Sequence, residues 1–489
     1  MTTISTPTSA GGLAELELQL REDLELLELP AKPWVPVHTH ESNTVRDVVV
    51  IGAGMCGLAA TAKLILSGIT NVVAYDIAPA GLEGPWVTFA RMQTLRSPKT
   101  LHGPSLGLPR LTFRAWFTAQ FGVAAWETLD KIPKGQWMDY LIWYRQVLQL
   151  PVHNEVKMTG LSFVGDLIAV DIEGAEAGRI LTRRLVLATG RSGLGGFAVP
   201  GFLEGVDTAR WAHSADNIDF ASLKGKRVAV IGAGASSMDN AATALEAGAS
   251  AVDLLIRRKQ MPRVNKMTGI GSQGVVQGMH GLDDAWKWKF VEYTGSTQTP
   301  PPRSSTLRVS RHANARFFLD CAILAVSEDD LGLLIETTQG LMRYDFLIAA
   351  TGFSNDFNNR PEFAEIARHI RSWEHGRQTL EMGTARKGMS DAPDLGASFE
   401  FRERVPGTCP GLKHIYCFND AAMLSHGKVS GDIPAVSAGA DRLVRGITAS
   451  LFAADVETHF ANLVAYDTPE LMGDEWTDST PLLQTEAVT

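Results

Sequence analysis

Two glycine-rich turns, each directly after a short apolar run, constrain the fold of this chain more than any other feature. Such a turn between a strand and a helix brings the backbone close to a pyrophosphate and aims helix amides at the phosphates. The pattern therefore predicts two dinucleotide sites in one chain; the alternative is that the glycines serve only tight connections. The small residues are Gly52, Gly54 and Gly57 after the run 48–51, and Gly232, Gly234, Ser236 and Ser237 after the run 228–231.

The first turn has the neighbours that a nucleotide-binding unit requires. An Ala-rich helical pattern follows over residues 58–66, and a second strand is expected over 72–75. Asp76 ends that strand about 20 residues beyond the last glycine, where a carboxylate meets a ribose hydroxyl. We therefore expect Asp76 to be part of the first site.

The second turn differs at the equivalent carboxylate position. Its second strand, 251–256, ends in Arg257 and Arg258. Paired guanidinium groups suit a ribose that carries a 2'-phosphate, which favours NADPH over NADH. The alternative is that the two arginines are a solvated strand end.

Composition narrows the class of partner. The chain has 489 residues, 45% of them hydrophobic, and a net charge of −9 without a long basic stripe. This argues against nucleic acid or a membrane as partner and favours small molecules. No secretory signal is visible in residues 1–12 and no run reaches the roughly 18 apolar residues of a membrane span, so the cytoplasm is the expected location.

The cysteines and histidines exclude two kinds of site. Cys56, Cys321, Cys409 and Cys417 have no C-x-x-C spacing, so no local redox pair is expected. The histidines offer no convincing set of metal ligands, and no metal site is predicted.

The order of the segments predicts an α/β protein with two Rossmann-like dinucleotide-binding domains, the first interrupted by the second. Matching Ala-Thr-Gly turns at 188–190 and 350–352 allow the chain to cross between the domains. A helix from Pro434 to Arg445 is expected near the first site. The predicted divisions are an N-terminal helical extension over 1–45, the first domain over 46–215 and 346–467, the second over 216–345 with an inserted segment 261–314, and a tail over 468–489.

Taken together, several motifs resemble those of the class B flavin monooxygenases, which comprise the flavin-containing, N-hydroxylating and Baeyer-Villiger enzymes. They are the two glycine turns about 180 residues apart, the Ala-Thr-Gly pair, Gly84-Pro85-Trp86, and Pro200-Gly201 followed by His213-Ser214. The resemblance spans residues 46–460 and implies FAD in the first site, with Trp86 and Asp420 among its contacts, and NADPH in the second. The segment 207–213 departs from the family's F-x-G-x-x-x-H signature, so the subfamily stays open.

The resemblance also implies the reaction. NADPH reduces FAD, the reduced flavin forms a peroxide adduct with O2, and one oxygen atom passes to a small organic substrate, by N- or S-oxidation or by Baeyer-Villiger insertion. Arg303 and His213 are the candidate catalytic residues. The alternatives for Arg303 are a contact to a substrate carboxylate, a contact to the NADPH phosphate, or plain surface charge. The alternative for His213 is a structural role in supporting the linker.

Other functions and states stay open at this point. A flavin-linked NADPH reductase or oxidase without oxygen insertion is the alternative activity, and a nucleotide-sensing protein without turnover is the other class. The N-terminal helix is expected to pack on the body of the protein or on a second subunit, so a homodimer is one expected state.

Overall fold

The computed structural model describes residues 12–41, 43–377 and 389–481. The expectations for the first eleven residues and for the end of the tail, 482–489, lie outside the described residues. Within the described ranges, no helix is long and apolar enough to cross a membrane.

The first glycine turn belongs to a seven-stranded sheet in the order β5-β4-β3-β8-β7-β6, with β17 paired to β8. The apolar run before Gly52 forms β3, which lies between β4 and β8 and is buried from Asp47 to Ile51. Burial on both faces explains why this strand reads as a continuous apolar run. The strands are β3 Arg46–Ile51, β4 Val72–Tyr75, β5 Val152–His153, β6 Val156–Val164, β7 Leu167–Gly174, β8 Gly178–Leu187 and β17 Ile415–Cys417.

The second glycine turn belongs to a separate sheet of five parallel strands, in the order β12-β11-β10-β16-β9. A three-stranded antiparallel sheet, β13-β14-β15, is connected to this five-stranded sheet because β15 leads directly into β16. The bounds are β9 Trp211–His213, β10 Arg227–Ile231, β11 Ala251–Ile256, β12 Ala315–Leu319, β13 Ile323–Asp329, β14 Gly332–Thr337, β15 Gly340–Tyr344 and β16 Phe346–Ala349. A pair of antiparallel two-residue strands, β1 Thr39–His40 and β2 Asn43–Thr44, precedes β3.

The chain crosses between the two sheets twice, and the two crossings lie side by side. Phe197 and Phe353 form an antiparallel bridge, and the Ala198 N–H donates to the Gly352 carbonyl at 3.0 Å. Both predicted Ala-Thr-Gly turns are located here, with positive φ at Gly190 (70°) and Gly352 (87°). The residues after each turn therefore form a two-stranded connection between the halves of the molecule.

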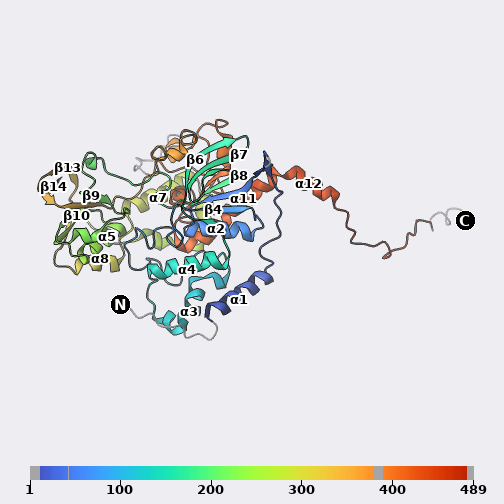
Figure 1. Cartoon of the computed structure of the whole chain (residues 1–489), viewed down its shortest axis with the longest axis horizontal. Coiled ribbons are helices and arrows are strands. Elements are labelled where there is room, and N and C mark those ends of the chain that lie inside the picture. The colour runs from blue at the N-terminus through green and yellow to red at the C-terminus, as the bar shows by residue number, and fades with distance from the viewer. Residues whose placement is uncertain (1–11, 42, 378–388, 482–489) are drawn as a thin grey trace.

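Helices cover both sheets, as Figure 1 shows, with the second sheet at the left of the view and the first at its centre. In the first half α11 packs on α2, and in the second half α8 packs on α5. The predicted helix around 434–445 is longer than expected, because α11 continues to Ala454. The helices are α1 Gly12–Leu26, α2 Met55–Leu66, α3 Phe113–Thr128, α4 Lys134–Val147, α5 Ala235–Glu246, α6 Gln273–Gly278, α7 Asp284–Thr297, α8 Arg303–Ser310, α9 Trp373–Arg377, α10 Met423–His426, α11 Val436–Ala454 and α12 Val456–Ala465.

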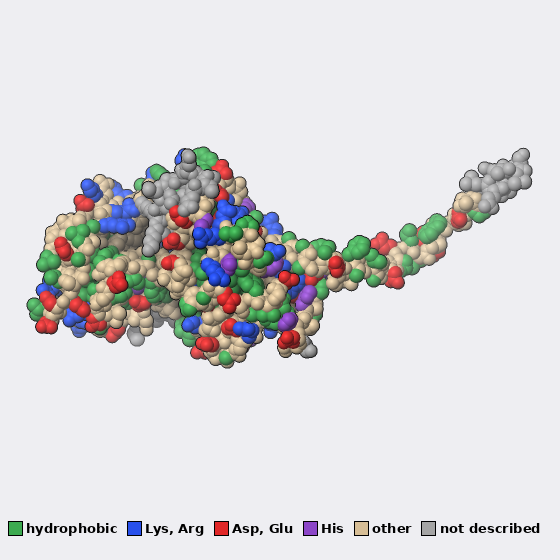
Figure 2. Space-filling view, turned by 90° about the horizontal axis from the view of Figure 1, so that it is seen from above, with side chains coloured by type: hydrophobic (Ala, Val, Ile, Leu, Met, Phe, Trp, Pro, Cys, Tyr) green, Lys and Arg blue, Asp and Glu red, His purple; other side chains and the backbone are tan. Residues whose placement is uncertain are grey.

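The two ends of the described chain behave differently. The helix α1 buries Leu16 and Leu20 and packs on α3. The guanidinium of Arg110, in the turn before α3, meets the Asp23 carboxylate at 3.0 Å. At the other end, α12 and the residues after it extend away from the body, as both Figure 1 and the space-filling view in Figure 2 show. One end therefore contributes to the core, while the other forms a projecting arm.

Candidate functional site

The first glycine turn is shaped by three glycines with three different tasks. Gly52 has φ = 99°, and a Cβ there would overlap the Ala188 carbonyl; a Cβ at Gly57 would overlap the Gly52 carbonyl oxygen. A Cβ at Gly54, in contrast, would meet nothing nearer than the Gly84 Cα at 3.8 Å. Gly52 and Gly57 thus let the strand, turn and helix pack, while the space over Gly54 is open to a ligand.

Asp76 holds this turn together from the end of β4. Its carboxylate accepts from the Ala53 N–H at 2.6 Å and from the Ala78 N–H at 2.8 Å. Burial raises the pKa of Asp76, and the two amide donors act against that rise. The predicted carboxylate therefore orders the backbone of the loop itself.

The indole N–H of Trp86 is a hydrogen-bond donor that has no acceptor, and it lies near the open space over Gly54. Its Nε1–H is buried and has no hydrogen-bond partner in the protein, and it would lie 3.5 Å from a Cβ on Gly84. The indole is held by an edge-to-face contact with Trp137, at 6.0 Å between ring centroids. Because a buried donor without a partner is costly, this N–H fits a ligand that brings an acceptor.

Asn419 connects the carboxyl ends of β8 and β17 by hydrogen bonds. The sequence predicts a role only for its neighbour Asp420. The Asn419 amide donates to the Leu187 carbonyl and to the Thr189 hydroxyl, both at 3.2 Å, and its oxygen caps Ala421. Asp420 is half-exposed, 3.7 Å from the Arg191 guanidinium. The sequence signal that could have identified Asn419 is its position just after strand β17, directly before Asp420.

Arg96 lies between the inserted segment and the residues before α11. The sequence analysis did not predict a role for it. Its Nη1 donates to the Pro300 carbonyl at 2.8 Å, so it joins the first half of the molecule to the segment before α8. Burial lowers the pKa of Arg96, and the nearby Asp432 carboxylate opposes this effect. A cation thus stands between the segment before α11 and the insertion.

The second turn resembles the first, with a serine at the third small position. Gly232 has φ = 119°, and a Cβ there would lie 2.9 Å from the Ala350 carbonyl oxygen; over Gly234 the nearest atom would be Gln298 Nε2 at 3.8 Å. Ser237 is fully buried, and its hydroxyl donates to the Gly234 carbonyl at 2.8 Å. Ser236 is exposed on the first turn of α5. The geometry leaves room for a ligand over Gly234.

The arginines at the end of β11 stand beside this turn. Arg257 is exposed, whereas Arg258 is half-buried and donates to the Ser296 carbonyl at 3.1 Å. Both follow the last residue of β11, the neighbour of β10 in the parallel sheet. Their position at the carboxyl edge of the sheet is the one at which α/β sheets bind nucleotides.

His213 is enclosed by the connection between the halves. It is buried and stacks on Phe197 at 4.4 Å, its Nδ1 accepts from the Ala215 N–H at 3.2 Å, and its Nε2 pairs with the Gly352 carbonyl at 2.9 Å. An Nδ1 that accepts leaves the proton on Nε2, so the imidazole is neutral. Burial lowers the pKa of His213. These contacts are those of linker support, which was one of its two predicted roles.

The arginines around the insertion divide into paired and exposed ones. Arg308 bridges the halves, because it pairs with Glu246 at 2.7 Å and also donates to the Arg91 carbonyl at 3.1 Å. Arg316 pairs with Asp253 at 2.6 Å. Arg303, the candidate catalytic residue, is the exposed first residue of α8. It follows the segment 300–302 that Arg96 contacts.

The thiols near the first turn are unsuited to electron transfer. All four cysteines are free, and Cys56 donates from Sγ to the Ser430 carbonyl at 3.2 Å. Burial raises the pKa of Cys56 to about 12. A protonated, unpaired thiol cannot accept electrons from a flavin as a disulfide would. Two glycine turns at the carboxyl ends of parallel strands define an α/β protein of the dinucleotide-binding kind, and its four cysteines form no disulfide.

Comparisons with known proteins agree with this class. The model of the pyridine nucleotide-disulphide oxidoreductase family matches residues 46–368. An FAD-dependent urate hydroxylase of Xanthomonas campestris pv. campestris is 37% identical over 469 residues, covering 96% of this chain and 99% of that protein. The chain therefore belongs to the pyridine nucleotide-disulphide oxidoreductase family and, within it, to the FAD-dependent monooxygenases, as its motifs predicted. The predicted cofactors, FAD and NADPH, are those of this class.

Solved structures show the same fold. An ornithine hydroxylase from Pseudomonas aeruginosa superposes with a TM-score of 0.65 at 14% identity, covering 82% of this chain and 98% of that one. An ornithine N-hydroxylase of Kutzneria sp. 744, solved with reduced FAD, NADP+ and L-ornithine, gives 0.64 at 16% identity, covering 83% and 99%. At these identities the likeness concerns the fold alone.

Proposed function

We propose that this protein is an NADPH- and FAD-dependent hydroxylase of urate or a closely similar oxidised purine. The observation that carries the proposal is the 37% identity to a urate hydroxylase over nearly the full length of both chains. The matched region includes both glycine turns, the connection between the halves and α11, so the likeness covers the whole site and more than one motif.

The first half of the chain would hold FAD. When bound, FAD supplies the redox chemistry, taking electrons from NADPH and activating O2. The α2 N-terminus and the space over Gly54 would receive the pyrophosphate, Asp76 would hold the loop beside it, and the Trp86 N–H would donate to the cofactor. Asp420, directly after Asn419 at the end of β17, would contact the flavin side. The orphaned Trp86 donor and the open space over Gly54 fit this cofactor.

The second half would bind NADPH. Gly232 and Gly234 bring the turn close to the pyrophosphate, and the exposed hydroxyl of Ser236 and the N–H groups at the start of α5 can donate to it. Ser237 supports the turn from beneath. Arg257 and Arg258 take the 2'-phosphate, for which guanidinium groups offer two parallel donors.

The substrate would enter between the halves, next to the inserted segment. The Arg96 contact to Pro300 joins this segment to the first half of the molecule. Arg303 supplies a cation at the start of α8, which favours negative charge that develops on oxygen or binds an acidic substrate. His213 acts as a positioning residue that holds the connection between the halves.

The organisation that supports this function follows the predicted divisions. We propose an FAD domain over 46–215 and 346–467, an NADPH domain over 216–345 and an N-terminal extension over 1–45 whose helix α1 braces α3. The parallel sheets and the paired crossings support this division. A location in the cytoplasm and the use of O2 fit an enzyme that draws on NADPH.

The decisive experiment measures NADPH oxidation, O2 uptake and hydrogen peroxide release by the purified holoprotein with and without urate. We expect urate to accelerate NADPH oxidation, one O2 to be consumed per NADPH, and labelled oxygen from O2 to appear in the product, with little peroxide. Ornithine serves as a control and is expected to have no such effect. Peroxide equal to NADPH with every substrate would instead establish the oxidase alternative.

A further inference from the structure

An irregular stretch of chain connects the two halves of the molecule, and we call it the bridging segment, residues 87–96. On the FAD half, Thr94 forms an antiparallel bridge with Pro133. Lys134, the first residue of α4, donates from Nζ to the Ala90 carbonyl at 2.6 Å. The bridging segment is therefore attached to the FAD half at two points.

The start of the bridging segment is folded onto the loop that contains Trp86. The Thr88 hydroxyl donates to the Gly84 carbonyl at 2.8 Å, and the Ala90 N–H donates to the Pro85 carbonyl at 2.9 Å. The loop and the bridging segment therefore form one folded unit. Because the Trp86 N–H would donate to FAD, this unit links the FAD site to whatever the bridging segment contacts.

Arg91 reaches from the bridging segment to the NADPH half. Its Nη2 donates to the Asp216 carbonyl at 3.1 Å, and its guanidinium lies over the Phe220 ring, 5.3 Å from the ring centroid. Both partners belong to the stretch between β9 and β10, where the chain enters the NADPH half. Burial lowers the pKa of Arg91, and a cation over an aromatic ring is held more strongly where water is partly excluded.

Arg308 of α8 reaches in the opposite direction, from the NADPH half to the bridging segment. Its Nη1 donates to the Arg91 carbonyl at 3.1 Å, and its side chain is only 13% exposed. Its Nε and Nη2 donate to the Glu246 carboxylate at 2.9 and 2.7 Å. A two-pronged contact of this kind restricts the orientation of the guanidinium, so Nη1 is kept directed at the Arg91 carbonyl.

The carboxylates around Arg308 connect this contact to the second glycine turn. Glu246 and Asp239 both belong to α5, which begins directly after Gly234, and Asp239 stands 3.4 Å from Arg308 Nη1. Burial raises the pKa of Asp239, while a hydrogen bond from Ser305 and the charge of Arg308 oppose the rise. Figure 1 shows α5 and α8 side by side. Because the first N–H groups of α5 would face the NADPH pyrophosphate, Arg308 links the helix that would receive NADPH to the bridging segment.

A third contact lies at the end of the bridging segment. Arg96 donates from Nη1 to the Pro300 carbonyl of the NADPH half at 2.8 Å. The guanidinium groups of Arg91, Arg96 and Arg308 thus donate across the boundary at three separate points of the chain. Two halves joined only by a two-stranded connection would be expected to rotate against each other, and these contacts oppose that rotation.

We propose that Arg91 and Arg308 are positioning residues, which hold the NADPH half at the angle where the nicotinamide lies against the flavin. The inference rests on the proposed binding of FAD and NADPH in the two halves and is independent of urate as the substrate. Hydride transfer moves both electrons and the proton of one nicotinamide C–H bond to the flavin, so NADPH becomes NADP+ and the oxidised flavin becomes its reduced anion. Such a step needs reacting atoms about 3–3.5 Å apart, and a displacement of about 1 Å costs about a hundredfold in rate.

The test is anaerobic reduction of the FAD-loaded full-length protein by NADPH in a stopped-flow spectrophotometer, without urate. The concentration dependence separates the dissociation constant for NADPH from the limiting rate of flavin reduction. For Arg91→Met we expect a limiting rate about a hundredfold lower. We expect the same for Arg308→Lys, which keeps a charge beside Glu246 but loses the two-pronged contact. The dissociation constant for NADPH should change by less than about threefold, because neither side chain is proposed to bind the nucleotide.

Arg343→Met is the matched control. The Arg343 guanidinium also pairs with a carboxylate, that of Asp329, but this pair lies wholly within the three-stranded sheet of the NADPH half. This variant should be reduced at the wild-type rate. Arg91→Lys can still donate to the Asp216 carbonyl and should recover part of the rate that Arg91→Met loses. The long-wavelength absorbance of nicotinamide stacked on reduced flavin should be weaker in both slow variants.

Flavin content and melting temperature show whether each variant is folded, and Arg308→Lys keeps the test valid if Arg91→Met loses flavin. A purely structural role would lower the melting temperature and leave the limiting rate unchanged. That result in both variants, or a higher dissociation constant with an unchanged limiting rate, would overturn the inference and leave the proposed function intact. A wild-type flavin that NADPH does not reduce would overturn both.

Discussion

The two glycine turns are built on one plan but differ in how much space they leave. In the FAD half, a side chain at Gly57 would overlap the Gly52 carbonyl, whereas the NADPH half accommodates Ser237 at the same step by turning its hydroxyl back onto Gly234. The strand ends differ as well, since Asp76 fastens the first turn and Arg257 remains exposed beside the second. One turn is held by its own carboxylate, whereas beside the other turn Arg257 is exposed and Arg258 donates to the Ser296 carbonyl.

The difference suits the two nucleotides. FAD remains bound through many turnovers and can be enclosed by a tight loop. NADPH must exchange in every cycle, so exposed arginines that capture a phosphate are more useful than a buried carboxylate that orders the loop. Four substitution experiments test this difference between the two halves, from the largest expected effect to the smallest.

Replacement of Gly57 by alanine should have the largest effect. The added methyl group must displace the Gly52 carbonyl, and overpacking of this kind costs about 1–3 kcal/mol of folding free energy. We expect loss of most of the bound FAD, measured as flavin absorbance per protein, and a lower melting temperature. Ser237→Ala, the matched change in the other turn, should retain full flavin. A Gly57→Ala protein with a full complement of FAD would show that the first turn is not tight.

Removal of both Arg257 and Arg258 should raise the KM for NADPH by about a hundredfold, since hydrogen bonds to charged groups contribute about 1.5–3 kcal/mol each. The KM for NADH should change less than threefold. Arg257→Ala alone should account for much of the effect, because Arg258 also contacts the Ser296 carbonyl. Steady-state kinetics with both nucleotides measures this, and equal changes for NADPH and NADH would remove the argument for a 2'-phosphate site.

Arg303→Ala should lower kcat about tenfold, the loss of roughly one charge-assisted interaction in the transition state. Flavin content and the KM for NADPH should be unchanged. Arg311→Ala, another exposed arginine at the end of α8, is the matched control and should behave like wild type. If both variants keep the wild-type kcat, Arg303 is surface charge.

The pH dependence of stability should report on His213, between the two halves. Its pKa is lowered in the folded state, so the unfolded chain binds the proton more readily as the pH falls below the ordinary value of 6.5. The stability contributed by the neutral imidazole is thus present above that value and is lost on acidification, by up to about 1.4 kcal/mol per pH unit. His213→Gln should unfold in denaturant with a flatter dependence between pH 6.5 and more acid conditions. Parallel curves for both proteins would contradict this.

Much of the fold could be predicted because its determinants are local. Continuous apolar runs before Gly52 and Gly232 predicted β3 and β10, and the Pro434 signal predicted the start of the helix that includes α11. The helix was predicted to end at Arg445, where the sequence carries no stop signal, and α11 continues to Ala454. Near its end, the Arg184 guanidinium of β8 donates to the Ser450 carbonyl at 2.8 Å, a contact that joins segments far apart in the sequence.

The site could be predicted only where a motif marks it. The glycines, Asp76 and the arginine pair were visible because their spacing reflects a single βαβ unit. Asn419 and Arg96 were missed, since each acts on a partner about 200 residues away or more: Asn419 on Leu187, and Arg96 on Pro300. Such pairs leave no periodic pattern in one sequence.

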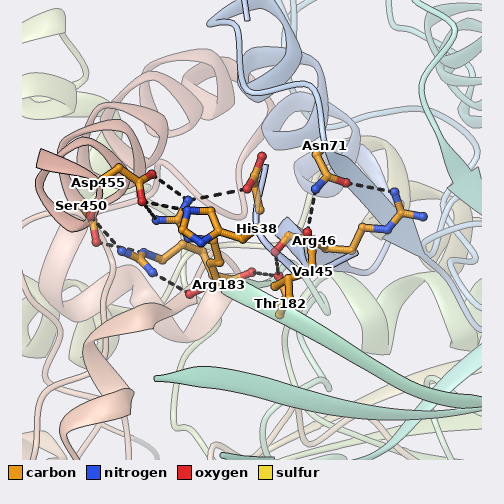
Figure 3. Close-up of polar contacts among 10 residues, drawn as sticks. His38, Val45, Arg46, Asn71, Thr182, Arg183, Ser450 and Asp455 are labelled. Atoms are coloured by element: carbon orange, nitrogen blue, oxygen red, sulfur yellow. Dashed lines mark hydrogen bonds and ion pairs between the residues drawn. The ribbon is translucent and has the colours of Figure 1, made fainter. Parts of the chain in front are cut away.

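By itself, the sequence predicted the two glycine turns, the cofactors FAD and NADPH and the class of flavoprotein, because steric and electrostatic demands at each turn are met by neighbouring residues. Only the tertiary structure decided the setting of those units: His213 locked into the connection, the orphaned Trp86 donor over open space, and the joint before α12. At that joint the Arg183 guanidinium reaches Asp455 across 272 residues of chain, as Figure 3 shows. Burial and direction are properties of the packed molecule, since they arise when distant segments exclude water from one another.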